Sequence, residues 1–187
     1  SAVEEYLRIY KIHLTVTQHR KSILGDYRHR THFSNHRISI NGTLNKYSFL
    51  ITLLHEIAHL LTFEKYGNKV MAHGNEWKAI YASLLKQFVE NKVFPPDIER
   101  ELLDSLKNPA ASSCAEDDLI RVLRKYDSNK NGFKLVEEIP VNSFFKIDDG
   151  KIFKKGEKQR KRFKCEEVKT GKVYLFSPVY EVEQVTG

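Results

Sequence analysis

The segment LLHEIAHLL, residues 53–61, places two histidines and a glutamate where they could do chemistry together. His55 and His59 are four positions apart, which puts both side chains on one face of an α-helix, and Glu56 directly follows the first histidine. Two such imidazoles can bind one Zn²⁺, and the carboxylate can take a proton from a zinc-bound water. Core histidines are the alternative, but unpaired polar groups among leucines would cost about 1–3 kcal/mol each. We therefore expect a metal site on this helix.

A catalytic zinc ion usually has three protein ligands and one open position, so a third ligand must lie elsewhere in the chain. The metzincin pattern would need glycine and histidine where this chain has Thr62 and Lys65, which excludes that pattern. Glu76 is one candidate. His73 in the segment MAHGNEW is the stronger one, because Gly74 beside it would let the backbone turn the imidazole toward the metal. The alternative for His73 is an ordinary exposed loop histidine.

The elements that must position these residues follow from the periodicity of apolar side chains. A short helix is expected over residues 3–10. Three strands should follow it, at residues 11–17, 22–28 and 37–40. The metal helix should have Ser48 as its N-cap and end at Gly67. A second helix is expected over residues 75–91, and Pro96 suits the first turn of a third.

The segment NPAASS, residues 108–113, has the composition of a linker and predicts two domains. The boundaries expected from it are residues 1–108 and 109–187. The second domain should begin with a short helix within residues 115–127. From Phe133 onward, short alternating segments are separated by Asp-Gly, Lys-Gly and Thr-Gly turns, which predicts a small antiparallel sheet. The chain as a whole is therefore expected to be of the α+β class.

Residues 127–138, DSNKNGFKLVEE, match the pattern of a calcium-binding EF-hand loop. Lys134 occupies the position that usually carries a β-branched apolar residue, and Pro140 prevents a helix from following the loop. We therefore interpret this segment as a polar turn that enters the C-terminal sheet.

Positive charge is concentrated in the C-terminal sheet. The net charge is +7, and the segment from Lys151 to Lys172 has ten basic and three acidic residues, which gives 10 − 3 = +7. The expected nucleic-acid contacts are Lys154, Lys155, Lys158, Arg160, Lys161, Arg162 and Lys164. Phe153 and Phe163 lie between them and could stack on unpaired bases. The alternative is a solvated hairpin whose lysines protect a sheet edge.

Cysteine usage and hydropathy indicate the compartment. Cys114 and Cys165 form no Cys-x-x-Cys pair, so we expect them to be packing residues in a reducing environment. The chain has no run approaching the ~20 apolar residues of a membrane-spanning helix, and its first residues do not resemble a signal peptide. These features predict a cytoplasmic protein without membrane association.

The segment HEIAH, followed after thirteen residues by HGNEW, resembles the SprT-like metallopeptidase domain, the group that includes the Spartan DNA–protein crosslink proteases. In layout the resemblance covers residues 3–91. It implies a zincin-like domain in which a small β-meander packs on the metal helix. It also implies that His55, His59 and His73 bind one zinc ion and that Glu56 is the general base. Family members often end in a zinc ribbon with two cysteine pairs, whereas here only Cys165 stands in such a segment, as in a bacterial-type member with a degenerate ribbon.

The resemblance implies a zinc metalloendopeptidase that hydrolyses peptide bonds of DNA-associated proteins, in a bacterium near the nucleoid. Zincin-type enzymes commonly hold their substrate as an added strand, and residues 37–40 are the expected sheet edge. Tyr27, Arg28 and the loop histidines are candidates for stabilising the oxyanion. Two alternatives stay open: a general zinc peptidase or hydrolase without a nucleic-acid role, and a non-enzymatic nucleic-acid-binding protein with a structural zinc. Glu56 argues against the second, since a structural site needs no base.

Overall fold

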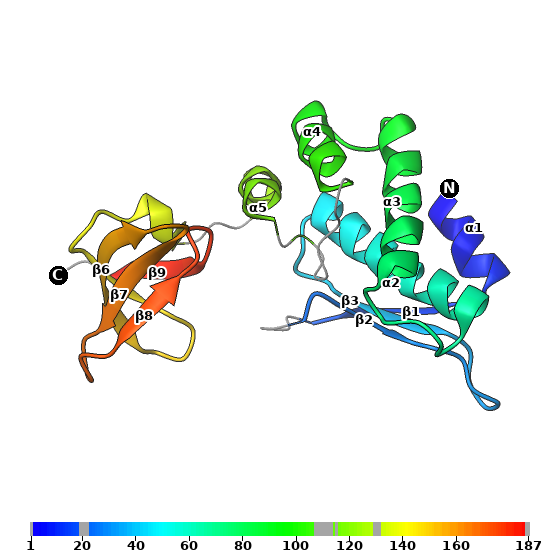
Figure 1. Ribbon diagram of the computed structural model, residues 1–187, viewed down its shortest axis with the longest axis horizontal. Coiled ribbons are helices and arrows are strands. Elements are labelled where there is room, and N and C mark those ends of the chain that lie inside the picture. The colour runs from blue at the N-terminus through cyan, green and yellow to red at the C-terminus, as the bar shows by residue number, and fades with distance from the viewer. Residues whose placement is uncertain (1, 19–22, 107–113, 115, 129–131, 186–187) are drawn as a thin grey trace. The chain divides into compact units, whose positions relative to one another are not determined.

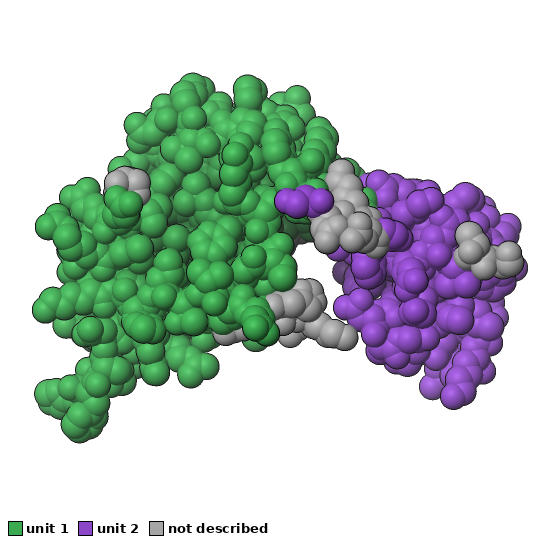
Figure 2. Space-filling model, turned by 180° about the vertical axis from the view of Figure 1, so that it is seen from behind, with its two compact units in different colours: residues 1–127 green, residues 128–187 purple. Residues whose placement is uncertain are grey.

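The computed structural model describes residues 2–18, 23–106, 114, 116–128 and 132–185. The protein is α+β, as predicted, and it divides into two compact units, residues 1–127 and 128–187 (Figure 2). Within the described ranges, no helix combines the length and the apolar character needed to cross a membrane.

Unit 1 contains a small sheet and most of the helices (Figure 1). Its elements are α1 (Ala2–Ile9), β1 (His13–Thr17), β2 (Gly25–Arg28), β3 (Arg37–Asn41), α2 (Lys46–Tyr66), α3 (Asn75–Glu90), α4 (Pro96–Ser105), α5 (Asp117–Leu123) and the 3₁₀ turn η1 (Arg124–Tyr126). The helix α2 lies across one face of the sheet, and α3 packs on α2. The core between them includes Leu54, Ile57, Trp77 and Leu85, all fully buried.

The sheet of unit 1 has the strand order β1-β3-β2. The strand β3 is central, parallel to β1 and antiparallel to β2. The expectation of a β-meander is therefore wrong, and residues 37–40 are not the sheet edge. Ile38 and Ile40 of β3 are buried because this strand has a neighbour on each side and α2 above it. Within the described part of the chain, β2 pairs with β3 alone and contacts α2, so β2 is the edge strand nearest this helix.

The helix α2, which carries His55 and His59, begins about one turn earlier than expected. Its N-cap is Asn45, whose side-chain oxygen accepts hydrogen bonds from the N–H groups of Tyr47, at 3.0 Å, and Ser48, at 2.9 Å. Ser48, the expected cap, lies inside the helix and is buried. The predicted end at Gly67 is confirmed: this residue has φ +62° and donates from its N–H to the carbonyl of Phe63.

The boundary between the units differs from the expected division at residues 108 and 109, because α5 belongs to unit 1. It contacts α4 and buries Leu119, Val122 and Leu123 in the core of unit 1. The expected linker, residues 108–113, lies outside the described residues. So do residues 129–131 of the calcium-type loop. In the described part of that loop, Glu138 accepts a hydrogen bond from the N–H of Leu135 at 2.7 Å, next to the first strand of unit 2.

Unit 2 is an antiparallel sheet, as predicted. Its elements are β4 (Phe133–Leu135), the 3₁₀ turn η2 (Val136–Glu138), β5 (Phe144–Lys146), β6 (Ile152–Gln159), β7 (Arg162–Glu167), β8 (Val173–Phe176) and β9 (Glu181–Val185). The strand order is β4-β9-β5-β6-β7-β8. Phe153 and Phe163 are 1% and 9% exposed and form the core of this unit with Phe145 and Cys165. The expectation that these two phenylalanines stack on bases is therefore wrong.

Candidate metal centre

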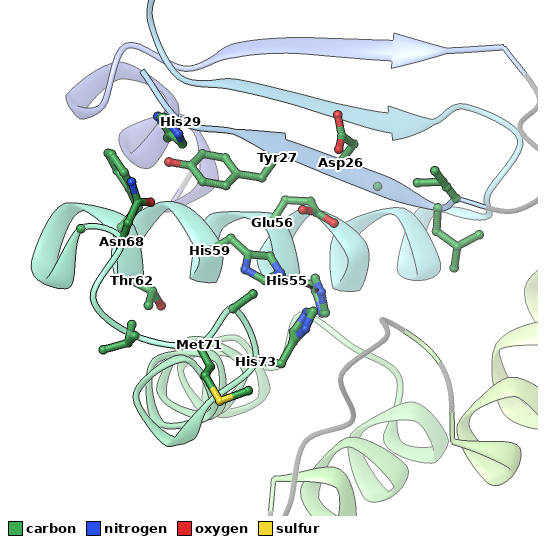
Figure 3. A pocket seen from close by; sticks show the side chains of 17 residues that line it. Asp26, Tyr27, His29, His55, Glu56, His59, Thr62, Asn68, Met71 and His73 are labelled. Atoms are coloured by element: carbon green, nitrogen blue, oxygen red, sulfur yellow. Dashed lines mark hydrogen bonds between the residues drawn. The ribbon is translucent and has the colours of Figure 1, made fainter. Parts of the chain in front are cut away.

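Three histidines converge on one point at the floor of a cleft (Figure 3). His55 and His59 lie one turn apart in the middle of α2, and His73 comes from the loop before α3, next to the N-cap residue Gly74. One ring nitrogen of each histidine lies within 4.8 Å of those of the other two. The Nε2 atoms of His55 and His59 are 3.3 Å apart. Among the described residues, these three histidines form the cluster that could hold a metal ion; Glu76, the alternative third ligand, is not part of it.

An aromatic wall holds the three imidazoles in place. Trp77 of α3 is fully buried, and its ring centroid lies 4.7 Å from that of His55, 5.2 Å from that of His59 and 4.7 Å from that of His73. Tyr81, one turn further along α3, packs edge-on against His55 at 5.4 Å. These ring contacts restrict the rotation of the three histidine side chains.

Two atoms of the cluster are buried without a protein partner. In the described part of the chain, neither Nδ1 of His55 nor Nε2 of His73 has a hydrogen bond. A buried polar atom left unpaired costs about 1–3 kcal/mol, so such atoms are rare unless a ligand satisfies them. Three imidazole nitrogens are a donor set that suits zinc and leave a fourth position open. The residues present therefore fit a catalytic zinc ion.

Burial keeps these histidines neutral, which is the form that binds a metal. Removal from water lowers the pKa of His55 to about 3, and the neighbouring His59 and His73 add to the shift. Burial, with a contribution from His73, lowers the pKa of His59 to about 4. The pKa of His73 is also lowered by burial. At neutral pH all three rings can offer a lone pair.

Glu56 is a buried carboxyl group beside the cluster. It is 5% exposed, and burial, assisted by the negative charge of Asp26, raises its pKa to about 8. A nearby cation would lower this pKa again by favouring the carboxylate. The edge strand passes very close to it: a Cβ atom on Gly25 would lie 2.6 Å from Oε1 of Glu56 and 2.7 Å from Cγ2 of Thr52. Glycine at position 25 therefore allows β2 to run directly over the carboxyl group.

The cleft above the cluster has a volume of about 720 Å³. One side is formed by residues 23–27 of β2 and the segment before it, and the other by residues 67–73 between α2 and α3. The floor is α2, with His55, Glu56 and His59. A chain of extended polypeptide could thus lie between the edge strand and the loop that carries His73.

A hydrogen-bond network behind the cleft was not apparent from the sequence. The Tyr27 hydroxyl lies 2.9 Å from Nδ1 of the buried His36, and Nε2 of His36 lies 3.4 Å from Glu64. The ring of Tyr27 stacks parallel to that of His59 at 6.4 Å. These residues are distant in sequence and form no recognisable spacing, so only the strand pairing could have revealed the network.

The candidates for oxyanion stabilisation are placed differently from one another. The hydroxyl of Tyr27 is engaged with His36 and points toward His29, away from the three metal-site histidines (Figure 3). The side chain of Arg28 pairs with Asp26 at 3.0 Å, and Arg28 does not line the cleft. Of the loop histidines, His29 lines the cleft and stacks on Phe63 at 4.5 Å.

Six of the seven basic residues expected to contact nucleic acid are exposed on β6, on β7 and in the turn between them. They are Lys154, Lys158, Arg160, Lys161, Arg162 and Lys164. Lys155 is the exception and corrects the prediction: it is 2% exposed, and its Nζ donates to the carbonyl oxygens of Ile139 and Glu137. Cys165 is buried in the same sheet, and Cys114 packs against the core of unit 1.

Comparison with known proteins gives one match. A family model described as the SprT-like family matches residues 3–99. This range includes the histidine cluster, Glu56 and the whole sheet of unit 1. Neither the curated proteins nor the solved structures contain a match to the chain.

Proposed function

Because the chain belongs to the SprT-like family, we propose that it is a zinc-dependent metallopeptidase with a zincin-like catalytic unit. The observation that carries this proposal is the cluster itself. His55, His59 and His73 present neutral nitrogens within 4.8 Å of one another, and the carboxyl group of Glu56 lies beside them in an open cleft. A purely structural zinc site would need neither the cleft nor the carboxyl group.

His55, His59 and His73 would hold the zinc ion, and Trp77 would keep their rings in the binding orientation. When bound, zinc supplies Lewis-acid chemistry: it polarises a peptide carbonyl and lowers the pKa of water toward ~7. The Nε2 atoms of His55 and His59, which lie 3.3 Å apart, and the unpartnered Nε2 of His73 are the atoms that support this assignment most directly.

Glu56 would move the proton during hydrolysis. As the oxygen of water forms its bond to the peptide carbon, a carboxylate oxygen of Glu56 takes the proton that leaves this water. The same group then gives a proton to the amide nitrogen as the carbon–nitrogen bond breaks. Burial raises the pKa of Glu56, and a cation held beside it would lower that pKa again by favouring the carboxylate. The group can then be ionised to take the proton and can give it to the leaving amine.

The edge strand β2 is the best support for an extended substrate. It borders the cleft from Gly25 to Tyr27, and an added strand would receive main-chain hydrogen bonds from it. Gly25 brings this strand within reach of Glu56, so a peptide held there would pass over the catalytic carboxyl group.

We further propose that the substrates are proteins associated with DNA in a bacterial cytoplasm. The exposed Arg160 and Lys161 of the turn between β6 and β7, with Arg162 at the start of β7, support this because phosphate groups are attracted to such clusters. A general peptidase without a nucleic-acid role and a non-enzymatic binding protein are the competing functions.

Cleavage of a DNA-binding protein, with and without single-stranded DNA, distinguishes these functions. The wild-type chain should cut, and Glu56→Gln, which keeps the shape of the side chain, should be slower by about 10²–10⁴-fold, the usual effect of losing a general base. Acceleration by DNA supports a DNA-linked protease, and cutting that ignores DNA supports a general peptidase. If the zinc-loaded wild-type chain cuts nothing, the peptidase proposal is wrong.

A further inference from the structure

The sheet of unit 1 has a second face, turned away from α2. On this face His13 of β1 pairs directly with Arg37 of β3, and Arg37 pairs with Arg28 of β2. All three side chains are exposed. Since neighbouring strands lie ~4.8 Å apart, these three basic side chains form a row ~10 Å long across the sheet.

A second row lies beside the basic one. It consists of Thr15, Ser39 and Asp26, again paired across the three strands. The two rows line a shallow hollow of about 220 Å³. Hydroxyl groups next to guanidinium groups in such a hollow are donors that suit a phosphate.

The arginines of this face are available to an incoming anion. Among the described residues, Arg37 has neither an ion pair nor a side-chain hydrogen bond. Arg28 pairs with Asp26 at 3.0 Å, but its side chain is 67% exposed, and surface pairs of this kind contribute little. A phosphate could therefore replace Asp26 as the partner of Arg28.

An exposed aromatic side chain lies at the end of the same sheet. The hairpin between β2 and β3 extends beyond the strands (Figure 1), and the same projection is visible on unit 1 in Figure 2. Phe33 in this hairpin is 99% exposed. Its turn is held by backbone bonds between Thr31 and Ser34 in both directions, and the N–H of Phe33 donates to Oγ1 of Thr31 at 3.2 Å. An apolar ring that is fully exposed on an ordered turn suits stacking on a partner.

The hairpin is fixed to the catalytic unit and is basic. Arg30 donates two hydrogen bonds to Glu64 of α2, at 3.1 and 3.3 Å, and the ring of His29 stacks on Phe63. Residues 27–37 contain three arginines, three histidines and no acidic residue. The position of the tip relative to the cleft is therefore set by contacts within unit 1.

We propose that these residues bind single-stranded nucleic acid. The outer-sheet surface, defined as His13, Arg28, Arg37 and Phe33, takes the phosphates on its basic row, and Phe33 stacks on an unpaired base. The strand β2 then has the peptide cleft on one side and nucleic acid on the other. The placement of substrates near the cleft rests on the proposed peptidase function, whereas the binding itself does not.

The test uses the full chain with the Glu56→Gln substitution, so that no cleavage interferes. Fluorescence anisotropy measures binding to an oligothymidylate of about 20 nucleotides, longer than the ~4–16-nucleotide sites of typical single-strand binders. Arg37→Ala should weaken binding about 10-fold and make the salt dependence shallower by ~0.7 in log–log slope, because one phosphate contact is lost. Phe33→Ala should weaken binding about 10-fold at every salt concentration, since stacking is not ionic.

Matched controls come from α4, outside the outer-sheet surface. Arg100→Ala removes another exposed arginine, whose side chain is 72% exposed, and Leu103→Ala removes another exposed apolar side chain, 50% exposed. Both should bind as the parent does. Circular dichroism checks that all four variants are folded, which we expect because each altered side chain is exposed.

Three results would overturn the proposal. The first is absence of binding by the parent. The second is unchanged binding by both Arg37→Ala and Phe33→Ala. If alanine at Arg160 and Lys161 then abolishes binding, the nucleic acid contacts unit 2 alone. The third is that polyglutamate binds more tightly than the oligothymidylate, competes with it, and is weakened by the same two substitutions. This result would identify an acidic protein as the partner. Failure of the wild-type chain to cleave proteins would leave this binding result unaffected.

Discussion

Each unit of the protein buries basic groups: nitrogen atoms of the histidine cluster in unit 1 and the side chain of Lys155 in unit 2. The two units differ in whether the protein itself provides hydrogen-bond partners for the buried nitrogen atoms. In unit 1, three neutral histidines lie together, and Nδ1 of His55 and Nε2 of His73 are left without a partner. In unit 2, the ammonium of Lys155 donates to the carbonyl oxygens of Ile139 and Glu137 and lies 4.1 Å from the centre of the Phe163 ring. Unit 2 satisfies its buried group from its own chain, whereas unit 1 leaves room for a ligand.

This difference shows how a buried polar group indicates function. A satisfied group such as Lys155 links the sheet to the turn η2 and is explained by structure alone. A cluster of histidines with unsatisfied buried nitrogen atoms has a cost that folding alone does not explain, so a ligand is the simplest explanation. Removal of the metal should therefore lower the stability of unit 1 only, and substitution of Lys155 should lower the stability of unit 2 only.

Metal removal should give the largest effect. A ligand that binds the folded chain but not the unfolded chain, present at about 1,000 times its Kd, adds ~4 kcal/mol to the free energy of unfolding. Chelation of the metal removes this contribution from unit 1. The fluorescence of Trp77, the single tryptophan, reports on this unit because its ring contacts all three histidines. Hydrogen exchange in β6 and β7 should not change on chelation. Increased exchange in those strands would instead reveal a second metal in unit 2, and the two units would then not differ in this respect.

The substitution Lys155→Ala should give the second largest loss of stability. It leaves the carbonyl oxygens of Ile139 and Glu137 without their donor and opens a cavity in the sheet core, which together should cost about 2–4 kcal/mol in unit 2. Lys154→Ala, the neighbouring exposed lysine on the same strand, should change stability by less than ~0.5 kcal/mol. Hydrogen exchange of the backbone amides in β5–β7 measures the stability of unit 2 in both variants. Equal effects of the two substitutions would mean that Lys155 is not a structural link.

Gly25→Ala should disturb the site through the backbone. The new Cβ would lie 2.6 Å from Oε1 of Glu56, so β2 or the carboxyl group must shift, at a cost of about 1–3 kcal/mol. Gly42→Ala is the matched control, because its Cβ would lie 2.8 Å from Cγ1 of Val16, away from Glu56. Both variants should lose stability in urea unfolding, but only Gly25→Ala should lose kcat for peptide cleavage. A Gly25→Ala enzyme with normal kcat would show that the close approach has no catalytic role.

The pH dependence of the metal-free protein should give the smallest effect. Between pH 6.5 and 8 the folded chain keeps a proton on Glu56 that the unfolded chain has lost, so stability should fall as pH rises, by up to ~2 kcal/mol over these 1.5 pH units. Below pH 6.5 the unfolded histidines take up protons that buried His55 and His59 do not, so stability should also fall toward pH 4. Urea unfolding across this range measures both arms. In Glu56→Gln the fall above pH 6.5 should disappear; its persistence there would assign it to another group.

The sequence predicted the local parts of the site well. The spacing of His55 and His59, the end of α2 at Gly67 and the start of α3 at Asn75 all depend on helical periodicity and on local capping, which the sequence displays directly. The family assignment and the α+β class also followed from short motifs. The N-cap at Asn45 was missed because asparagine and serine are equally good caps, and packing decides between them.

The parts that depend on contacts between distant segments were predicted poorly. The order β1-β3-β2 places residues 37–40 in the centre of the sheet, and no local pattern distinguishes this arrangement from a meander. The burial of Lys155 could have been recognised, since it is two residues from Phe153 and therefore faces the same side of β6. The positive charge of the segment led to the prediction that Lys155 lies on the nucleic-acid surface. The alternation of side chains along the strand would have placed it on the buried face.

The zinc content of the purified chain decides whether His55, His59 and His73 hold the metal. Mass spectrometry of the dialysed full chain should find one zinc ion per molecule in the wild type and in Glu56→Gln, none in His59→Ala, and one in Cys165→Ala, because Cys165 lies buried in unit 2. Zinc retained by His59→Ala but lost from Cys165→Ala would show instead that the metal belongs to the sheet of unit 2 and not to the histidine cluster.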